Sequence, residues 1–207
     1  MIWFTVLIAI LGYAAWARYR ERWFLSFSLA LIEHAKKTPF FPLFNQDGSP
    51  YMERFWIVPF LKDDPTGGRK WYRSPVVWLL QQLDIGIRVH HIQSSDIFAM
   101  HDHPWPWASR VLLGGYWEVR PVFKDGIYQG ERREWRKAGS WAFRRASSFH
   151  RIELEDVGGL ATVEAWTLFI TGPWQQRWGF MPEPAHNKVY YRDYLGLDSP
   201  RRVKEQS

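Results

Sequence analysis

The sequence contains no cysteine, and this absence limits the chemistry that the protein can support. Without thiols there is no disulfide, no thiolate metal ligand and no cysteine nucleophile, so any metal must be bound by His, Asp or Glu. Internal repeats and low-complexity segments are also lacking, which excludes collagen-like and coiled-coil architectures. The 207 residues, 46% hydrophobic and 23% charged, are enough for about one domain with a packed core.

The body of the chain also lacks an excess of one charge. The net charge of +6 is concentrated outside the body, in residues 18–37 and in the basic tail 201–207, whereas residues 38–200 hold 19 basic and 18 acidic side chains. Binding to a phosphate backbone needs a clustered basic face. The composition therefore excludes nucleic acid as the expected partner.

Aromatic residues are abundant, with 14 Trp, 14 Phe and 9 Tyr, and they favour strands and aromatic-lined pockets. From about residue 75, short strand-like segments alternate with glycine-rich turns. We expect strands at residues 85–92, 110–113, 116–122, 140–144, 150–154 and 162–170. Many short strands separated by such turns indicate a β-sandwich or barrel, so we predict an all-β domain over residues 38–200.

Residues 2–17 contain no charged side chain and are followed directly by Arg18, Arg20 and Arg22. As a helix they would extend about 24 Å, close to the roughly 30 Å hydrocarbon core of a membrane. Arginines that follow an apolar helix indicate that the body is cytoplasmic. We predict that residues 1–37 form a membrane-anchoring helix with a basic juxtamembrane segment. A cleaved signal peptide and a helix that packs on the body or a partner are the alternatives.

The residues best suited to chemistry are histidines in the segment His101-Asp102-His103. If this segment is extended, His101 and His103 project from one face and Asp102 from the other. Two imidazoles on one face can chelate a metal. A third ligand is expected from a neighbouring strand, and His150 fits because it begins an alternating pattern with apolar Ile152 and Leu154, where an unpaired imidazole would be costly to bury.

These residues resemble the cupin family, a group of jelly-roll β-barrels. The family's first motif matches His101, His103 and a glycine at 114 or 115, and the second motif matches Gly139 and His150. The resemblance covers about residues 85–172. The segments HDHPW, FRRASSFHRIEL and WTLFITGP with RWGF also resemble uncharacterised phage and bacterial cupin-like proteins. The resemblance implies a cupin-type jelly roll and, through sheet edges, a homodimer.

One departure from the family pattern concerns the metal ligands. Trp107 and Ala108 stand where the family has a glutamate, which leaves a set of three histidines. This set is similar to the variant in the thiol-dioxygenase branch of cupins, where three neutral histidines hold Fe(II). The resemblance implies one divalent metal bound by His101, His103 and His150, with Fe(II) expected first and Zn(II) or Mn(II) as alternatives. The Cys–Tyr crosslink of part of that branch is excluded, because the chain has no cysteine.

Candidate substrate contacts are less specific. An anionic small molecule could be positioned by arginines on the inward face of the barrel, and aromatic side chains could line its pocket. The candidates are Arg88, Arg110, Arg144, Trp105 and Tyr116. No catalytic residue can be assigned from the sequence.

The leading functional hypothesis is a metal-binding cupin that acts as a non-heme Fe(II) dioxygenase on a small molecule at the cytoplasmic face of a membrane. One alternative is a non-catalytic cupin that binds a sugar, a nucleotide or a protein partner. Another is a metal-dependent isomerase or epimerase, which needs an acid or base in the pocket. Glu118 and Glu164 are the candidates for that role by position.

Overall fold

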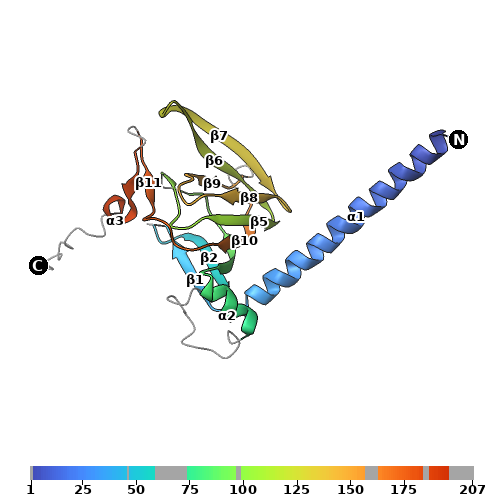
Figure 1. The fold of residues 1–207 in the computed structure, drawn as a ribbon, viewed down its shortest axis with the longest axis horizontal. Helices are drawn as coiled ribbons and strands as arrows, with labels where there is room; N and C mark the ends of the chain where they lie inside the picture. The colour runs from blue at the N-terminus through green and yellow to red at the C-terminus, as the bar shows by residue number, and fades with distance from the viewer. Residues whose placement is uncertain are drawn as a thin grey trace, which may run out of the picture.

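The structure, a computed structural model, describes residues 2–45, 47–58, 74–96, 99–156, 163–183 and 187–195, with side chains from residue 16 onward. A body made of β-strands carries one long N-terminal helix, α1 (Ile2–Ala35), which extends away from it (Figure 1). Two short helices, α2 (Pro75–Gln82) and α3 (Tyr191–Tyr194), complete the described elements. The protein is thus mostly β, as expected.

The first layer of the body is a six-stranded antiparallel sheet in the order β1-β2-β3-β10-β5-β8. Strands far apart in the sequence are neighbours in it, because β10 lies between β3 and β5. In sheet order its strands are Phe40–Phe44, Pro50–Val58, Gly86–Ile92, Ala165–Thr171, Trp107–Leu113 and Trp141–Arg144.

The second layer consists of two three-stranded sheets, ordered β7-β6-β9 and β12-β11-β4. Backbone hydrogen bonds between His101 and His150, each 2.9 Å, join these sheets edge to edge. The first contains β6 (Gly115–Lys124), β7 (Ile127–Lys137) and β9 (Arg151–Glu153). The second contains β4 (Met100–His101), β11 (Gly179–Met181) and β12 (Val189–Tyr190).

Side chains from both layers meet in the interior. On β10 the burial alternates strictly along the strand, as expected for a strand with one face toward a core. The main inner cluster joins the two layers and contains Met52, Ile92, Val111, Tyr116, Ile152, Leu154 and Ala165. This arrangement of two facing antiparallel layers is the predicted β-sandwich or barrel.

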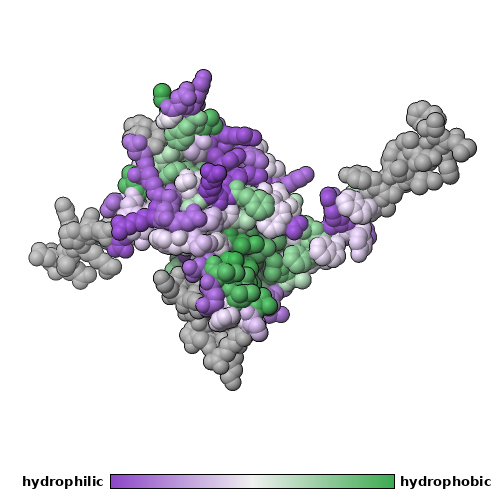
Figure 2. All heavy atoms as spheres, viewed as in Figure 1, coloured by the Kyte–Doolittle hydropathy of each residue, from purple (hydrophilic) through white to green (hydrophobic). Residues whose placement is uncertain are grey.

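The outer face of the six-stranded sheet is covered by the C-terminal end of α1. Ile32 and Ala35 are buried there against Phe55, Val89 and Leu112. The helix ends at Ala35, whose carbonyl accepts hydrogen bonds from the backbone N–H and the hydroxyl of Thr38. Figure 2 shows hydrophobic residues gathered on this face of the molecule, around α2 and this end of α1.

Within the part of the chain that the structure describes, no helix is long and apolar enough to cross a membrane. The structure therefore does not support the predicted membrane anchor. Side chains 2–15, most of the predicted apolar segment 2–17, lie outside the described residues. The boundary at residue 38 between the N-terminal segment and the body remains a prediction.

The sequence analysis overlooked several elements. Each of the six expected strands has a counterpart among the observed ones, although the start of 162–170 lies outside the described residues. The missed strands are β1, β2, β4, β7, β11 and β12, and both short helices were missed as well. Helix α2 carries a clear local signal, since Ser74 caps it by accepting a hydrogen bond from the Val77 N–H, with Pro75 at its first position.

A glycine is required where β5 turns into β6. Gly114 has a φ of +73°, a conformation that side chains disfavour. A Cβ atom at this position would overlap the carbonyl oxygen of Glu164. The family glycine expected at 114 or 115 thus allows β5 and β6 to separate into the two layers.

A buried carboxylate, Glu118 on β6, organises a group of charges beside the interior. Its side chain is 1% exposed and accepts hydrogen bonds from Arg136 at 2.6 and 2.8 Å and from Arg144 at 2.5 and 2.9 Å. Both guanidinium groups are largely buried as well. Charges removed from water in this way are tolerated because they neutralise one another.

We predict that Glu118→Gln lowers the free energy of unfolding by about 3–5 kcal/mol, because two largely buried guanidinium groups lose their counter-charge. Urea denaturation of the metal-free protein measures this change. The matched control is Glu131→Gln, whose partner Arg151 lies on the more exposed face of the same sheet. It should cost less than about 1 kcal/mol. Equal losses in the two variants would contradict the role assigned to Glu118.

Candidate metal centre

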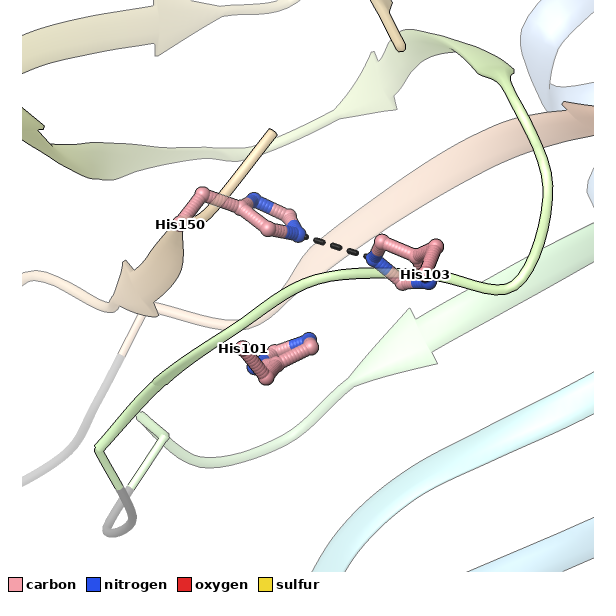
Figure 3. Close-up of side chains that lie close together, drawn as sticks. All are labelled: His101, His103 and His150. Atoms are coloured by element: carbon pink, nitrogen blue, oxygen red, sulfur yellow. Dashed lines mark hydrogen bonds between the residues drawn. The ribbon is translucent and has the colours of Figure 1, made fainter. Parts of the chain in front are cut away.

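Three histidine side chains converge in the interior, between the two layers. His101 lies on β4, His103 follows in the next loop, and His150 directly precedes β9. Their ring centroids are 4.9–5.2 Å apart, and one ligand nitrogen of each lies within 4.8 Å of the others. Figure 3 shows the three imidazoles turned toward a common centre, with Nε2 of His103 2.9 Å from Nε2 of His150.

The residue between the two ligand candidates of the first motif fixes their loop. Asp102 points away from the histidines, as predicted, and its carboxylate is 1% exposed. It accepts hydrogen bonds from the Gly179 N–H at 2.7 Å, from Gln176 at 2.8 Å and from Lys188 at 2.6 Å. These contacts tie the loop to β11 and hold His101 and His103 on the opposite, inward side.

Carboxylates also stand behind two of the histidines. Nδ1 of His101 lies 3.9 Å from Asp96, and Nδ1 of His150 lies 3.8 Å from Glu118. Asp96 is fixed in turn, since it accepts hydrogen bonds from the Tyr51 hydroxyl and from the Ile152 N–H. Each carboxylate lies beyond hydrogen-bond distance of the ring, so it places negative charge behind the histidine without a direct bond to it.

Burial keeps two of the imidazoles neutral. It lowers the pKa of His103 well below its usual value, and the neighbouring His101 and Arg88 lower it further. Burial likewise lowers the pKa of His150, with added contributions from His101 and His103. A neutral imidazole has a free lone pair, which is the form that binds a metal.

The residues present fit a divalent metal. Nδ1 of His150 is buried without a hydrogen-bond partner among the described residues, which leaves one nitrogen of that ring unsatisfied. The Nε2 atoms of His103 and His150 share one hydrogen bond, in which one ring donates its N–H to the other, and a cation bound by both lone pairs beside the third imidazole would replace that bond. His101, His103 and His150 are the residues that would hold it.

The histidines line a cavity of about 340 Å³, a size suited to a small organic molecule. Trp107, which stands where the cupin family has a glutamate, is 5% exposed, with its ring centroid 4.9 Å from that of His150. The wall next to the histidines is therefore aromatic, and no carboxylate from position 107 reaches them. Apolar side chains line much of the remainder, including Leu43, Met52, Ile92, Phe169 and Phe180.

The structure places three of the five predicted substrate contacts at this cavity: Arg88, Trp105 and Tyr116. Arg88 is 4% exposed, and its guanidinium lies over the ring of Trp105 at 5.2 Å. Tyr116 is buried, and burial together with the nearby Glu118 raises its pKa to about 12. Its hydroxyl is thus protonated at neutral pH.

The predictions for Arg110 and Arg144 need correction, since neither lines the cavity. Arg110 projects from the outer face of β5, where its guanidinium lies 4.4 Å from the ring centroid of Phe24 on α1. Alternation along β5 explains this, because the inward positions are Trp107, Ser109 and Val111. Arg144 is occupied by Glu118.

The two carboxylates considered for an isomerase are also placed elsewhere. Glu118 is bound by Arg136 and Arg144, and it does not line the cavity. Glu164 is half exposed and contacts His91 at 2.7 Å on the outer side. Neither is positioned as a pocket acid or base.

Two basic residues at the cavity were not among the predicted substrate contacts. Arg54 on β2 and His90 on β3 both line it, and they are cross-strand partners. Alternation from Arg88 could have identified His90, since residues 88, 90 and 92 share one face of β3. The adjacent His91 faces the other way, as alternation along a strand requires, and it contacts Glu53 and Glu164. No signal identified Arg54, because β2 itself was not predicted.

Comparison with models of protein families found no match to the sequence, and comparison with curated proteins found none either. Solved structures with similar folds include the FeII form of HppE, at 13% identity and a TM-score of 0.40 over 66% of this chain. The chain matches only 57% of the length of that protein.

In two other similar structures the match covers more of the other protein's chain than it does in HppE. A cupin 2 conserved barrel domain protein from Rhodopseudomonas palustris is 10% identical, with a TM-score of 0.43 over 71% of this chain and 79% of its own. The polyketide cyclase RemF from Streptomyces resistomycificus is 14% identical, with a TM-score of 0.42 over 70% of this chain and 79% of its own. These likenesses concern the fold alone. The strand order and the histidine group together give a two-layered β-barrel with a candidate site for a divalent metal.

Proposed function

We propose that the protein binds one Fe(II) ion through His101, His103 and His150 and oxidises a small molecule with dioxygen. The observation that carries the proposal is the convergence of three inward imidazoles, two of them kept neutral by burial, in a cavity large enough for a substrate. When bound, Fe(II) with three neutral protein ligands leaves coordination positions open for redox chemistry.

The surrounding side chains would exclude water, position the histidines and select the substrate. Trp107 and Phe169 stand beside His103, with ring centroids 5.4 and 5.8 Å from it, and they exclude water from that side. Asp102 holds the loop that carries the two first-motif histidines, and Asp96 stands behind His101. The shape and apolar lining of the cavity favour a compact organic substrate over a sugar or a nucleotide.

We predict that the full chain, purified without a His tag and loaded anaerobically with Fe(II), retains roughly one iron per chain. His101→Ala/His103→Ala should retain less than about a tenth of that, because a single remaining imidazole binds a divalent metal weakly. Plasma mass spectrometry after gel filtration measures the content.

The matched control is His91→Gln, which removes an imidazole from the outer face of β3 and should leave the iron content unchanged. Asp96→Asn should weaken iron binding by no more than about tenfold, because it removes a negative charge 3.9 Å from Nδ1 of His101 that makes no hydrogen bond to the ring. Equal iron in the wild type and the double variant would refute the site. Stoichiometric zinc retained in place of iron, with no oxygen uptake, would favour the non-catalytic binding module.

We also propose that the N-terminal helix associates with a membrane surface rich in anionic lipid. On the described part of α1, Trp16, Tyr19 and Trp23 are exposed, and they alternate with Arg18, Arg20 and Arg22. Exposed aromatic and basic side chains together suit the interface of a bilayer. This part of α1 extends away from the barrel (Figure 1).

Flotation of the full chain with lipid vesicles tests this association. Replacing Arg18, Arg20 and Arg22 by Gln should weaken binding to phosphatidylserine vesicles on the order of 100-fold, at about 1 kcal/mol per arginine. Replacing the exposed Arg132, Arg133 and Arg145 of the barrel removes the same charge and should have little effect. Equal losses in both triple variants would argue against a role for α1.

A further inference from the structure

A group of cationic and polar side chains lies on the floor of the cavity, on strands that contribute no histidine to the metal centre. Arg54 of β2 stands directly opposite His90 of β3, and Arg88 is the next inward residue on β3. All three line the same cavity as the histidine group. We call Arg54, Arg88 and His90 the cationic floor.

Burial of the polar groups of the cationic floor costs free energy. Arg88 is 4% and His90 is 8% exposed. The Nε atom of Arg54 and the Nε2 atom of His90 are buried without a hydrogen-bond partner in the described part of the chain. Burying polar groups without partners is unfavourable, and more so near a positive charge. A ligand that accepts hydrogen bonds and carries negative charge would remove this cost.

The described residues that line the cavity supply little negative charge. Asp96 is the one carboxylate among the described lining residues, and it already accepts hydrogen bonds from Tyr51 and from the backbone of Ile152. Arg54 makes a ring contact with Phe41 at 5.2 Å and has no ion pair with a described carboxylate. The guanidinium of Arg88 is held over the rings of Trp56 and Trp105 at 4.1 and 5.2 Å.

The cationic floor and the histidine group are close enough to share one ligand. Phe169 lies between them, with its ring centroid 4.7 Å from that of His90 and 5.8 Å from that of His103. Burial lowers the pKa of His90 well below its usual value, and Arg88, Arg54 and His103, which line the same cavity, lower it further. The remaining walls are apolar, formed by residues such as Met52, Ile92 and Phe180.

We infer that the cationic floor is a binding subsite for the anionic group of a compact, otherwise apolar organic acid, whose other end lies at the histidines. A carboxylate would accept hydrogen bonds from Arg54 and His90. The inference deepens the proposed function, because it assigns a substrate class to the same cavity. Anion binding itself needs only the floor and does not depend on the metal.

Paired probes of matched shape test the subsite. Phenylacetate is compared with phenylacetamide, and 4-methylpentanoate with 4-methylpentanamide, by isothermal titration of the full chain with and without Fe(II). We expect the acid of at least one pair to bind tenfold or more tightly than its amide. A charge-assisted hydrogen bond in a site shielded from water supports a difference of about this size.

Variants of the floor identify the residues responsible. Arg54→Gln should weaken binding of the acid about 10- to 100-fold and leave the amide within about twofold, and Arg54→Lys should restore part of the difference. The matched control, Arg145→Gln, removes an exposed arginine outside the cavity and should change neither affinity. Thermal melting and iron content of each variant show that it is folded.

The outcomes separate this inference from the proposed function. Tighter binding of the acid that Arg54→Gln abolishes supports the subsite, even if the protein binds no iron and the proposed function fails. If the wild type binds iron that His101→Ala/His103→Ala does not bind, and yet binds acid and amide with equal affinity, that result supports the metal site and overturns the subsite. Failure of the wild type to bind either acid, or an acid preference unchanged in Arg54→Gln, overturns it as well.

Discussion

Two backbone hydrogen bonds between His101 and His150, each 2.9 Å, connect the parts of the second layer. Because β4 has only two residues, this bridge and the pairing with β11 are what hold it in the layer. The same bridge brings two ligand candidates side by side, while Asp102 anchors the loop that positions His103. The backbone hydrogen bonds that close the second layer therefore also bring His101 and His150 together.

The interior beside this bridge is unusually polar for a small barrel. Glu118 pairs with Arg136 and Arg144, so each of these two guanidinium groups has a carboxylate partner within the protein. The histidines and the cationic floor are different, because His150 Nδ1, His90 Nε2 and Arg54 Nε have no partner among the described residues. Buried groups left without partners reduce stability, and such costs are typical of sites that bind ligands. The histidine group and the cationic floor thus line one cavity.

Alternation along extended segments was the most informative signal in the sequence. It placed His101 and His103 on one side and Asp102 on the other. It could not succeed where the strand itself was unrecognised, and Arg54 was missed for that reason. Arg110 and Arg144 were misplaced because inward orientation depends on strand register. Arg110 lies on the outer face, where it contacts Phe24 of α1. Arg144 is bound by the carboxylate of Glu118.

By itself, the sequence determined the class of fold and the identity of the possible metal ligands. Aromatic-rich strands between glycine turns can bury their side chains only in facing β layers, and a chain without cysteine must bind metal through His, Asp or Glu. The tertiary structure decided which groups share the cavity. Residues from β2, β3, β4 and the start of β9 meet there through pairings between distant segments, and the local pattern of a strand carries no information about its distant partners.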